Sequence, residues 1–370
     1  MKILFFANTD SYLSTLRLDL AKALQEQGHE VVMVSPAGEC VSSLQEAGFR
    51  WLEQPLSRRG INPFAELGYL RQVEALYRAE KPDLVHHFTI KPILYGSYAA
   101  RKLGIRAVVN TITGLGFVFL NPQLNAVLLR PLVKRFYRRA LQGSQVIFES
   151  PDCMSFFTEH NLVKAEQSQL IVGTGVDTRV FVPLSEPENI PLVALPGRML
   201  FDRGITDFID AAVLLRDSGV RARFALVGAN EPRHPSGIPL QQLGTWQKEG
   251  IVEWWGWQED ISAVFALADI ICLPSYREGV PRVLIEAAAS GRPIVTSDLP
   301  GCRQVVVDGE NGLLVPPHST TALAAALRRL IENRELCSAM GRRGRERALA
   351  VFSNERILEQ TLEAYRLAQL

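Results

Sequence analysis

The chain has 370 residues, of which 47% are hydrophobic and 21% are charged, and its 40 basic and 39 acidic residues leave a net charge of +1. Such a composition is typical of soluble globular proteins and excludes a disordered chain, a collagen-like repeat and a disulfide-rich scaffold. The length suggests about two domains. The balanced charge offers no general basic surface, so no nucleic-acid partner is expected.

The first half of the chain alternates strand-like and helix-like segments. Leu13, Leu16, Leu20 and Leu24 recur at helical spacing, and Gly28 stands where that helix would end. Short apolar or β-branched runs predict strands at residues 3–7, 30–35, 84–85, 107–109 and 146–148. This alternation is typical of a parallel α/β sheet.

A proline-rich segment at residues 181–191 is typical of an interdomain linker. The alternation then begins again, with strands predicted at 192–195, 223–227, 251–254, 270–273 and 293–296 and helices at 205–218, 261–266, 283–290 and 320–332. The sequence therefore predicts two α/β domains, residues 1–182 and 192–350, with a last helix at 354–370 that crosses back to the first domain. Two such sheets would face each other across a cleft, with ligands at the carboxyl ends of the strands.

No pattern indicates a bound metal or a membrane-spanning helix. The five cysteines have no paired spacing, which favours reduced thiols in a cytoplasmic protein. The adjacent His86 and His87 would point to opposite faces of a strand, one buried and one exposed, and would not bind one metal. Residues 107–129 carry no charge, but their asparagines, threonines and glutamine make a spanning helix unfavourable.

The strongest local motif is PSYREGVPRVLIEAAASGRP at residues 274–293, after a strand-like run. Gly279 suits a close approach to a ligand or a positive φ. Pro281 suits the first turn of a helix, whose free N–H groups bind anions. Glu278 before that helix and Glu286 in its second turn fit the hydroxyls of a sugar nucleotide with its diphosphate at the helix end. The alternative is a surface glutamate beside a buried ion pair.

A second motif, LPGRMLFDRG, spans residues 195–204. Arg198, directly after Gly197, and Arg203 could clamp the oxygens of a diphosphate. The alternative is a pair of surface arginines on an ordinary loop. The patterns GxxxxGK[ST] and GxGxxG do not follow the first strand, which disfavours nucleoside-triphosphate and nicotinamide sites.

Together, EGVPRVLIEA and GRMLFDRG resemble the retaining glycosyltransferases of family 4, which have the GT-B fold of two Rossmann-like domains. Longer stretches resemble one branch of that family, whose members build capsule, O-antigen and glycan-lipid precursors and include N-acetylgalactosaminyltransferases acting on undecaprenyl-diphosphate sugars. These stretches are residues 87–100, 110–119, 148–152, 173–178 and 299–316. The resemblance covers nearly the whole chain.

For the donor side, the resemblance implies three catalytic residues. Arg198 and Arg203 would hold the donor diphosphate, although relatives more often have lysine at the second position. Glu278 would face the donor sugar near the reacting carbon. Further donor-binding residues implied by the resemblance are Glu286, for the ribose hydroxyls, and Gly197, Gly279, Val280 and Pro281.

For the acceptor side, the resemblance implies a set of residues in the first domain. They are Asn8, Ser11, Arg17, Thr89, Lys91, Thr113 and Gly114. Two departures from the family pattern stand out. Residues 8–10 replace a glycine pair, and residues 110–113 replace a histidine near the reacting centre, whose role we assign to Thr113.

The resemblance further implies an enzyme without cofactor or metal, which transfers a sugar with retention of configuration. The expected donor is a UDP-sugar carrying an N-acetylhexosamine or a deoxy amino sugar. The expected acceptor is a polyprenyl-diphosphate-linked saccharide in the synthesis of a surface polysaccharide or glycan. A sugar-nucleotide epimerase of the same fold and a non-catalytic sugar-nucleotide-binding protein are the alternatives.

Five cations fall within residues 130–139 without an acidic residue between them: Arg130, Lys134, Arg135, Arg138 and Arg139. Leu128, Leu132 and Phe136 share a helical face opposite much of this charge. The pattern is typical of a helix on an anionic lipid surface, and a solvated basic helix is the alternative. Together with a lipid-linked acceptor, it predicts a protein bound peripherally to the inner face of the cytoplasmic membrane.

Overall fold

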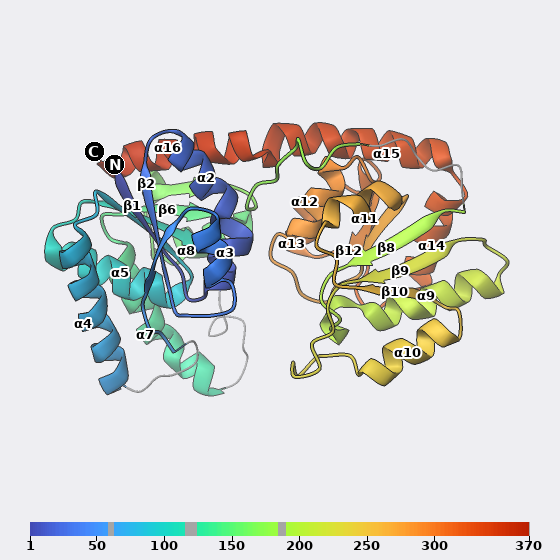
Figure 1. The fold of residues 1–370 in the computed structure, drawn as a ribbon, viewed down its shortest axis with the longest axis horizontal. Coiled ribbons are helices and arrows are strands. Elements are labelled where there is room, and N and C mark those ends of the chain that lie inside the picture. Colours follow the sequence, from blue (N-terminus) through green and yellow to red (C-terminus); the bar gives the residue numbers. More distant parts are fainter. Residues whose placement is uncertain (58–62, 115–123, 184–189, 370) are drawn as a thin grey trace. The chain divides into compact units, whose positions relative to one another are not determined.

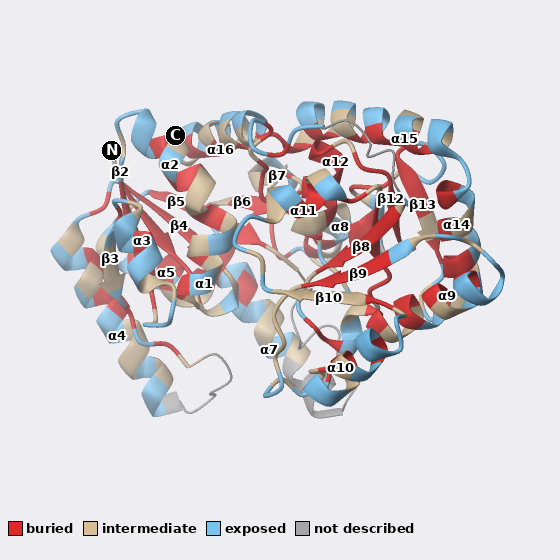
Figure 2. Cartoon of the chain, turned by 45° about the vertical axis from the view of Figure 1, so that its right-hand side comes forward, coloured by how far each residue is buried: buried red, intermediate tan, exposed pale blue. Residues whose placement is uncertain are grey.

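The computed structural model describes residues 1–57, 63–114, 124–183 and 190–369 (Figure 1). The chain divides into two compact units, Met1–Gly175 with Asn354–Leu370, and Val176–Ser353. In both units the buried residues concentrate on the strands and on the inward sides of the helices (Figure 2).

The first unit is built on a seven-stranded parallel sheet with strand order β3-β2-β1-β4-β5-β6-β7. The strands are β1 (Lys2–Phe6), β2 (Glu30–Ser35), β3 (Arg50–Glu53), β4 (Leu84–Phe88), β5 (Ala107–Ile112), β6 (Gln145–Phe148) and β7 (Ser168–Leu170). The predicted strands are confirmed, and the two edge strands β3 and β7 are additional. β3 carries charged residues at both ends, and β7 has three residues, so neither gives an apolar run that sequence patterns detect.

Helices cover both faces of this sheet. They are α1 (Asp10–Tyr12), α2 (Leu18–Glu26), α3 (Val41–Glu46), α4 (Pro63–Glu80), α5 (Ile90–Leu103), α7 (Leu124–Leu141), α8 (Pro151–Glu159) and α16 (Asn354–Gln369). The helix predicted through Leu13 and Leu24 is not a single α-helix, because Leu13–Arg17 forms a π-helical turn between α1 and α2. Helix α16 contacts α2, β5 and β6, all within the first unit.

The adjacent histidines of β4 point to opposite faces of the sheet. His86 Nδ1 lies 2.9 Å from the Tyr365 hydroxyl of α16, and His87 Nε2 lies 2.8 Å from the Tyr77 hydroxyl of α4. Both imidazoles are buried, so the expectation that one would be exposed is wrong: a helical layer covers each face. Burial lowers the pKa of both, that of His87 to about 4, and both are therefore neutral near pH 7.

The second unit holds a six-stranded parallel sheet with strand order β10-β9-β8-β11-β12-β13. The strands are β8 (Leu192–Pro196), β9 (Arg223–Val227), β10 (Glu253–Gly256), β11 (Ile270–Leu273), β12 (Ile294–Ser297) and β13 (Gly312–Val315). Strand β10 begins later than predicted. The Ile251 N–H donates a hydrogen bond to the Trp246 carbonyl of α10 and is therefore not available for pairing between strands. Strand β13 was not predicted.

The helices of the second unit are α9 (Ile205–Asp217), α10 (Leu240–Lys248), α11 (Ile261–Leu267), α12 (Arg282–Ala289), α13 (Pro300–Arg303), α14 (Thr320–Ile331) and α15 (Arg334–Arg347), followed by a π-helical turn at Ala348–Phe352. Helices α9, α11, α12 and α14 match the four predicted ones closely, whereas α10, α13 and α15 were not predicted. A short 3-10 turn, Phe201–Arg203, precedes α9.

The first unit ends at residue 175 rather than at the 182 expected from the prolines. The segment after Gly175 is held by the second unit, since the Val176 N–H donates to the Phe352 carbonyl at 2.9 Å. Arg345 of α15 also donates to the carbonyls of Thr178 and Phe181, at 2.9 and 2.6 Å. The middle of the predicted linker, residues 184–189, lies outside the described residues.

Candidate functional site

The two arginine- and glutamate-bearing motifs follow neighbouring strands of the second sheet. Strands β8 and β11 pair in parallel, so residues 197–204 and 274–281 leave the same edge. A Cβ on Gly204 would lie 1.9 Å from the Pro274 carbonyl oxygen, and the Tyr276 N–H donates to the Asp202 carbonyl at 2.9 Å. The strand order reverses at this pair, which is where open α/β sheets bind their ligands.

Within this edge the structure pairs one predicted cation with one predicted acid. Arg203 donates through Nη1 to Oε1 of Glu278, whose side chain is 9% exposed. Arg198 is more exposed, at 54%, and lies 3.2 Å from a carboxylate oxygen of Glu231 in the loop after β9. Glu231 was not recognised from the sequence, because nothing local links it to Arg198. Each predicted cation therefore has a carboxylate partner in this unit.

The other predicted donor residues belong to the start of α12. Pro281 immediately precedes the helix, and Glu286 is buried in its second turn. Arg282 Nε donates to Glu286 Oε1 at 2.8 Å and so fixes the carboxylate. Gly279 lies against α13, since its carbonyl oxygen would be 1.3 Å from a Cβ on Gly301.

An uncapped helix N-terminus adjoins the Arg203–Glu278 pair. Helix α9 begins at Ile205, and its N-cap residue, Gly204, has no side chain to cap the first turn; among the described residues no other side chain is seen to do so. Ser275, next to the Pro274 that touches Gly204, is fully buried, and its Oγ has no hydrogen-bond partner among the described residues. Buried hydroxyls are rarely left without a partner, and free N–H groups of a helix start favour an anion. Ser275 lies within the motif of residues 274–293, but no feature of the sequence distinguishes it from its neighbours.

A tyrosine supports this loop from the side. The Tyr276 ring stacks on His318 at 3.7 Å, and its hydroxyl donates to Asp207 Oδ2 at 2.9 Å. Burial and the hydrogen bond to Asp207 raise the pKa of Tyr276 to about 12. Thr320 donates to the other oxygen of Asp207 at 3.0 Å. The loop after β11 is thereby tied to α9 and α14.

The predicted acceptor-side residues come together at one edge of the first sheet. Asn8 and Ser11 follow β1, Thr89 follows β4, and Thr113 with Gly114 follows β5. These three strands are neighbours and parallel, so their carboxyl ends meet. The structure thus places the predicted set together, and its contact with an acceptor stays a prediction.

Asp10 holds the first loop, where the family resemblance leads us to expect a glycine pair. Its carboxylate is buried and accepts the N–H groups of Ser11 and Cys40 at 2.8 and 2.7 Å. A Cβ on Gly38 would lie 2.3 Å from Asp10 Oδ1. The carboxylate therefore joins the loop after β1 to the loop after β2.

Arg17 lies inside the first unit, on the π-helical turn. Its Nη2 donates to the Tyr12 hydroxyl at 2.5 Å and to Glu149, and its guanidinium lies 4.6 Å from the Phe88 ring centre. Burial raises the pKa of Glu149, an effect that Arg17 opposes. Arg17 is 4% exposed, so the contacts seen here anchor the first loop.

Thr89 and Lys91 stand at the junction of β4 and α5. Thr89 has φ of 70°, which a β-branched residue adopts only at a cost of about 1–3 kcal/mol. Its Oγ1 is buried without a hydrogen-bond partner among the described residues. Lys91 Nζ donates to Glu66 Oε1 of α4 at 2.6 Å.

Two of the basic residues of α7, Arg138 and Lys134, contact neighbouring parts of the first unit, and the other three differ in how exposed they are. Arg138 donates to the Asn161 carbonyl at 2.8 Å, and Lys134 lies 5.6 Å from the centre of the Phe156 ring. Arg135 and Arg139 are exposed, and Arg130 is half-buried.

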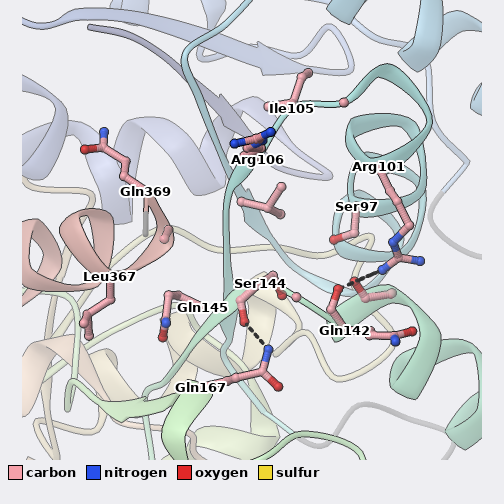
Figure 3. Close-up of a pocket in the computed structure, with 15 residues that line it drawn as sticks. Ser97, Arg101, Ile105, Arg106, Gln142, Ser144, Gln145, Gln167, Leu367 and Gln369 are labelled. Atoms are coloured by element: carbon pink, nitrogen blue, oxygen red, sulfur yellow. Dashed lines mark hydrogen bonds between the residues drawn. The ribbon is translucent and has the colours of Figure 1, made fainter.

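A cavity of about 570 Å³ lies elsewhere in the first unit (Figure 3). It opens at the amino ends of β5 and β6, where Gln167 Nε2 donates to the Ser144 carbonyl at 3.0 Å. Arg101 Nη2 donates there to the carbonyls of Arg139 and Gln142 and so closes the C-terminal end of α7. The predicted acceptor-side residues lie at the opposite edge of this sheet, where the carboxyl ends of β1, β4 and β5 meet.

Comparison with known proteins identifies the family. The model described as "Glycosyl transferase 4-like" matches residues 2–150, and the one described as "Glycosyl transferases group 1" matches residues 190–333. The chain is a glycosyltransferase with a 4-like domain and a group 1 domain. This glycosyltransferase is 26% identical over 368 residues to the N,N'-diacetylbacillosaminyl-diphospho-undecaprenol alpha-1,3-N-acetylgalactosaminyltransferase of Campylobacter jejuni, covering 96% of each chain. It is a hexosyltransferase, as expected.

Solved structures confirm the GT-B fold. A glycosyltransferase of Rickettsia africae aligns with a TM-score of 0.82 at 21% identity, covering 99% of this chain and 98% of that one. An Anabaena protein crystallised in complex with UDP aligns with a TM-score of 0.81 at 20% identity, covering 100% of both. In the described part of this glycosyltransferase, no helix has the length and apolar character that a membrane crossing requires.

Proposed function

We propose that this glycosyltransferase moves an N-acetylhexosamine or a deoxy amino sugar from a UDP-sugar to a polyprenyl-diphosphate-linked saccharide, with retention of configuration, during surface polysaccharide or glycan synthesis. The observation that carries the donor assignment is the uncapped start of α9 beside the buried Ser275 hydroxyl and the Arg203–Glu278 pair. The Anabaena neighbour binds UDP, which supports the base. The name of the Campylobacter relative supports a lipid-diphosphate acceptor.

The donor diphosphate would lie at the start of α9. Its negative charge would be met by the backbone N–H groups after Gly204, by the Ser275 hydroxyl and by Arg203 and Arg198. Glu286, held by Arg282, would accept hydrogen bonds from the ribose hydroxyls. Once the phosphate engages Arg203, Glu278 would be released toward the hydroxyls of the donor sugar.

The chemical step would need little more than charge stabilisation and positioning. The bond between the sugar's anomeric carbon and the diphosphate oxygen breaks, and its electron pair leaves with the nucleoside diphosphate. The acceptor hydroxyl oxygen bonds to the same face of the oxocarbenium-like carbon, and its proton passes to the departing phosphate. Arg203, Arg198 and the α9 N-terminus would stabilise the charge on the leaving group. The residues named for these roles require neither metal nor cofactor.

The test combines donor binding with turnover. We expect a UDP-sugar to raise the melting temperature more than GDP- or TDP-sugars, because only ligands of the native state stabilise it. We expect transfer to a short-chain polyprenyl-diphosphate saccharide, and a loss of at least ten-fold in kcat/KM for Arg198→Ala and for Glu286→Gln. Release of UDP from donor alone would favour the epimerase, and binding without turnover on any lipid-linked acceptor would favour a non-catalytic protein.

We infer that α7 rests on an anionic membrane surface. Leu132 and Phe136 are 48% and 52% exposed, and Arg135 and Arg139 fall on the same helical stripe, rather than opposite it as expected. Tyr137 on the other side of α7 is buried in the core. Apolar side chains between arginines suit the boundary of headgroups and acyl chains, where a lipid-linked acceptor would be found. The side chain of Leu128 lies outside the described residues.

Flotation with vesicles tests this surface. Arg135→Ser combined with Arg139→Ser should weaken binding to vesicles containing phosphatidylglycerol roughly thirty-fold, at about 1 kcal/mol per cation. Phe136→Ser should weaken it as well. The matched control replaces the exposed Arg342 and Arg343 of α15 with serine and should bind these vesicles as well as the wild type does. Equal flotation of all variants, or no preference for anionic vesicles, would contradict the assignment.

A further inference from the structure

The turn between β13 and α14 contains an exposed residue in a left-handed conformation. His318 has φ of 58°, a region that residues other than glycine rarely adopt, although asparagine, aspartate and histidine adopt it more often than most. The side chain is exposed, so its burial does not offset this conformation. Residues held in such conformations gather at functional sites, where the surrounding structure imposes them. The contacts of the His318 side chain therefore need an explanation.

The His318 imidazole covers one face of the Tyr276 ring. The two ring centres lie 3.7 Å apart and the ring planes are inclined by 24°, so the rings are stacked. Within the described residues the imidazole makes no hydrogen bond. The stack is therefore the specific contact through which His318 acts on the rest of the unit, and such aromatic pairs attract beyond the burial of their area.

Tyr276 is held at three points. Its hydroxyl donates to Asp207 in the first turn of α9, and its backbone N–H donates to the Asp202 carbonyl, both at 2.9 Å. The third contact is the His318 imidazole on the ring face. Thr320, at the start of α14, donates to the other oxygen of Asp207 at 3.0 Å, so the turn that carries His318 is itself tied to α9. The position of Tyr276 is thereby fixed from α9 and from the turn before α14.

The residues on either side of Tyr276 are those proposed to meet the donor. Ser275 precedes it, and Glu278, paired with Arg203, follows two residues later. A shift of the Tyr276 backbone is passed directly to both side chains, because so few peptide units separate them. A misplacement of about 1 Å at an active site costs roughly 100-fold in rate, so small shifts of this loop matter.

We propose that His318 is a positioning residue, which keeps residues 274–281 in their donor-binding position by stacking on Tyr276. The inference rests on the proposed function, which assigns Ser275 and Glu278 to the donor. His318 touches neither substrate in this scheme and acts through the Tyr276 ring. A stacked aromatic pair shifts an equilibrium roughly two- to ten-fold, and this range sets the size of the expected effect.

Two substitutions separate the role of the ring from that of the backbone. His318→Asn keeps a residue that tolerates the left-handed conformation and removes the ring, whereas His318→Phe keeps a ring. His318→Asn should lower kcat/KM for the donor roughly five-fold and leave the acceptor KM unchanged, and His318→Phe should retain most of the activity. A role of the backbone alone predicts the reverse order. The matched control is Lys81→Asn, at a position with φ of 47° in the first unit, which should behave as wild type.

Hydrogen exchange of the donor-free full chain gives a readout that does not depend on turnover. In His318→Asn the amides of residues 274–281 should exchange roughly two- to ten-fold faster, while those of β8 and β9 keep their rates, because only local opening becomes more frequent. In a Tyr276→Leu background, which has no ring to stack on, His318→Asn should have no further effect on exchange or on kcat/KM.

The outcomes separate this proposal from the proposed function. Unchanged exchange of residues 274–281 in His318→Asn, or lower activity in His318→Phe than in His318→Asn, overturns the positioning role. If Arg203→Ala loses activity while His318→Asn keeps that of wild type, the positioning role is overturned and the proposed donor site stands. If Arg203→Ala and His318→Asn both keep full activity, the proposed donor site fails together with the positioning role.

Discussion

Arg203→Ala should lower kcat/KM for sugar transfer roughly 10²- to 10³-fold, the range found when one preorganised charge-stabilising donor is removed from an active site. Two losses combine. The departing diphosphate loses a guanidinium at the start of α9, and Glu278, only 9% exposed, loses its partner and is no longer held in position. Because both contributions concern bond breaking, we expect kcat to fall more than the donor KM rises.

Steady-state kinetics with both substrates check this result. Arg203→Lys should recover part of the activity, since it keeps the charge but not the fork geometry. Arg216→Ala, at the far end of the same helix α9, is the matched control and should stay near wild type. Thermal melting should show that Arg203→Ala remains folded. Activity of this variant within three-fold of wild type would remove Arg203 from the catalytic set.

Gly301→Ala should be the most damaging single-methyl addition near the donor loop. The new Cβ would lie 1.3 Å from the Gly279 carbonyl oxygen and 3.0 Å from that of Glu278, so either α13 or the loop must move. Overpacking of this kind costs about 1–3 kcal/mol in stability, and a displacement of 1 Å at an active site costs roughly 100-fold in rate. We expect both effects, with the loss in rate dominant.

Urea unfolding and donor kinetics measure the two effects separately. Gly244→Ala is the matched control: it lies inside α10 with nothing within 4 Å of a new Cβ, and it should be neutral or slightly stabilising. A Gly301→Ala enzyme with wild-type kcat/KM would show that the contact between α13 and the donor loop does not set the position of Glu278.

Much of the architecture could be predicted because it depends on local pattern. Buried parallel strands read as continuous apolar runs, and these gave β1, β2, β8, β9 and β11 near their observed bounds. Edge strands with polar or very short sequences, such as β3 and β7, leave no such run. The π-helical turn before α2 was also hidden, because leucine spacing alone does not separate it from an α-helix.

The candidate site shows the same division. Arg203, Glu278 and Glu286 stand in recognisable motifs, and the structure places the first two in contact. Glu231 and Ser275 belong to the candidate site through contacts between loops that are distant in sequence, and a single sequence does not display such contacts. Arg17 shows the opposite outcome. The family resemblance implies an acceptor-side role for it, but the structure buries its side chain against Glu149.

The carboxylates beside Arg198 and Arg203 bear on selectivity. Glu231 and Glu278 are the counter-ions of the two arginines, so a diphosphate that binds at the proposed donor site would have to exchange for a carboxylate. A simple anion such as free phosphate would displace Glu278 from Arg203 without donating hydrogen bonds to the displaced carboxylate. A sugar nucleotide would donate hydrogen bonds from its sugar hydroxyls to the Glu278 carboxylate. On the proposed function, the ion pair would therefore favour binding of the complete donor over free phosphate or sulfate.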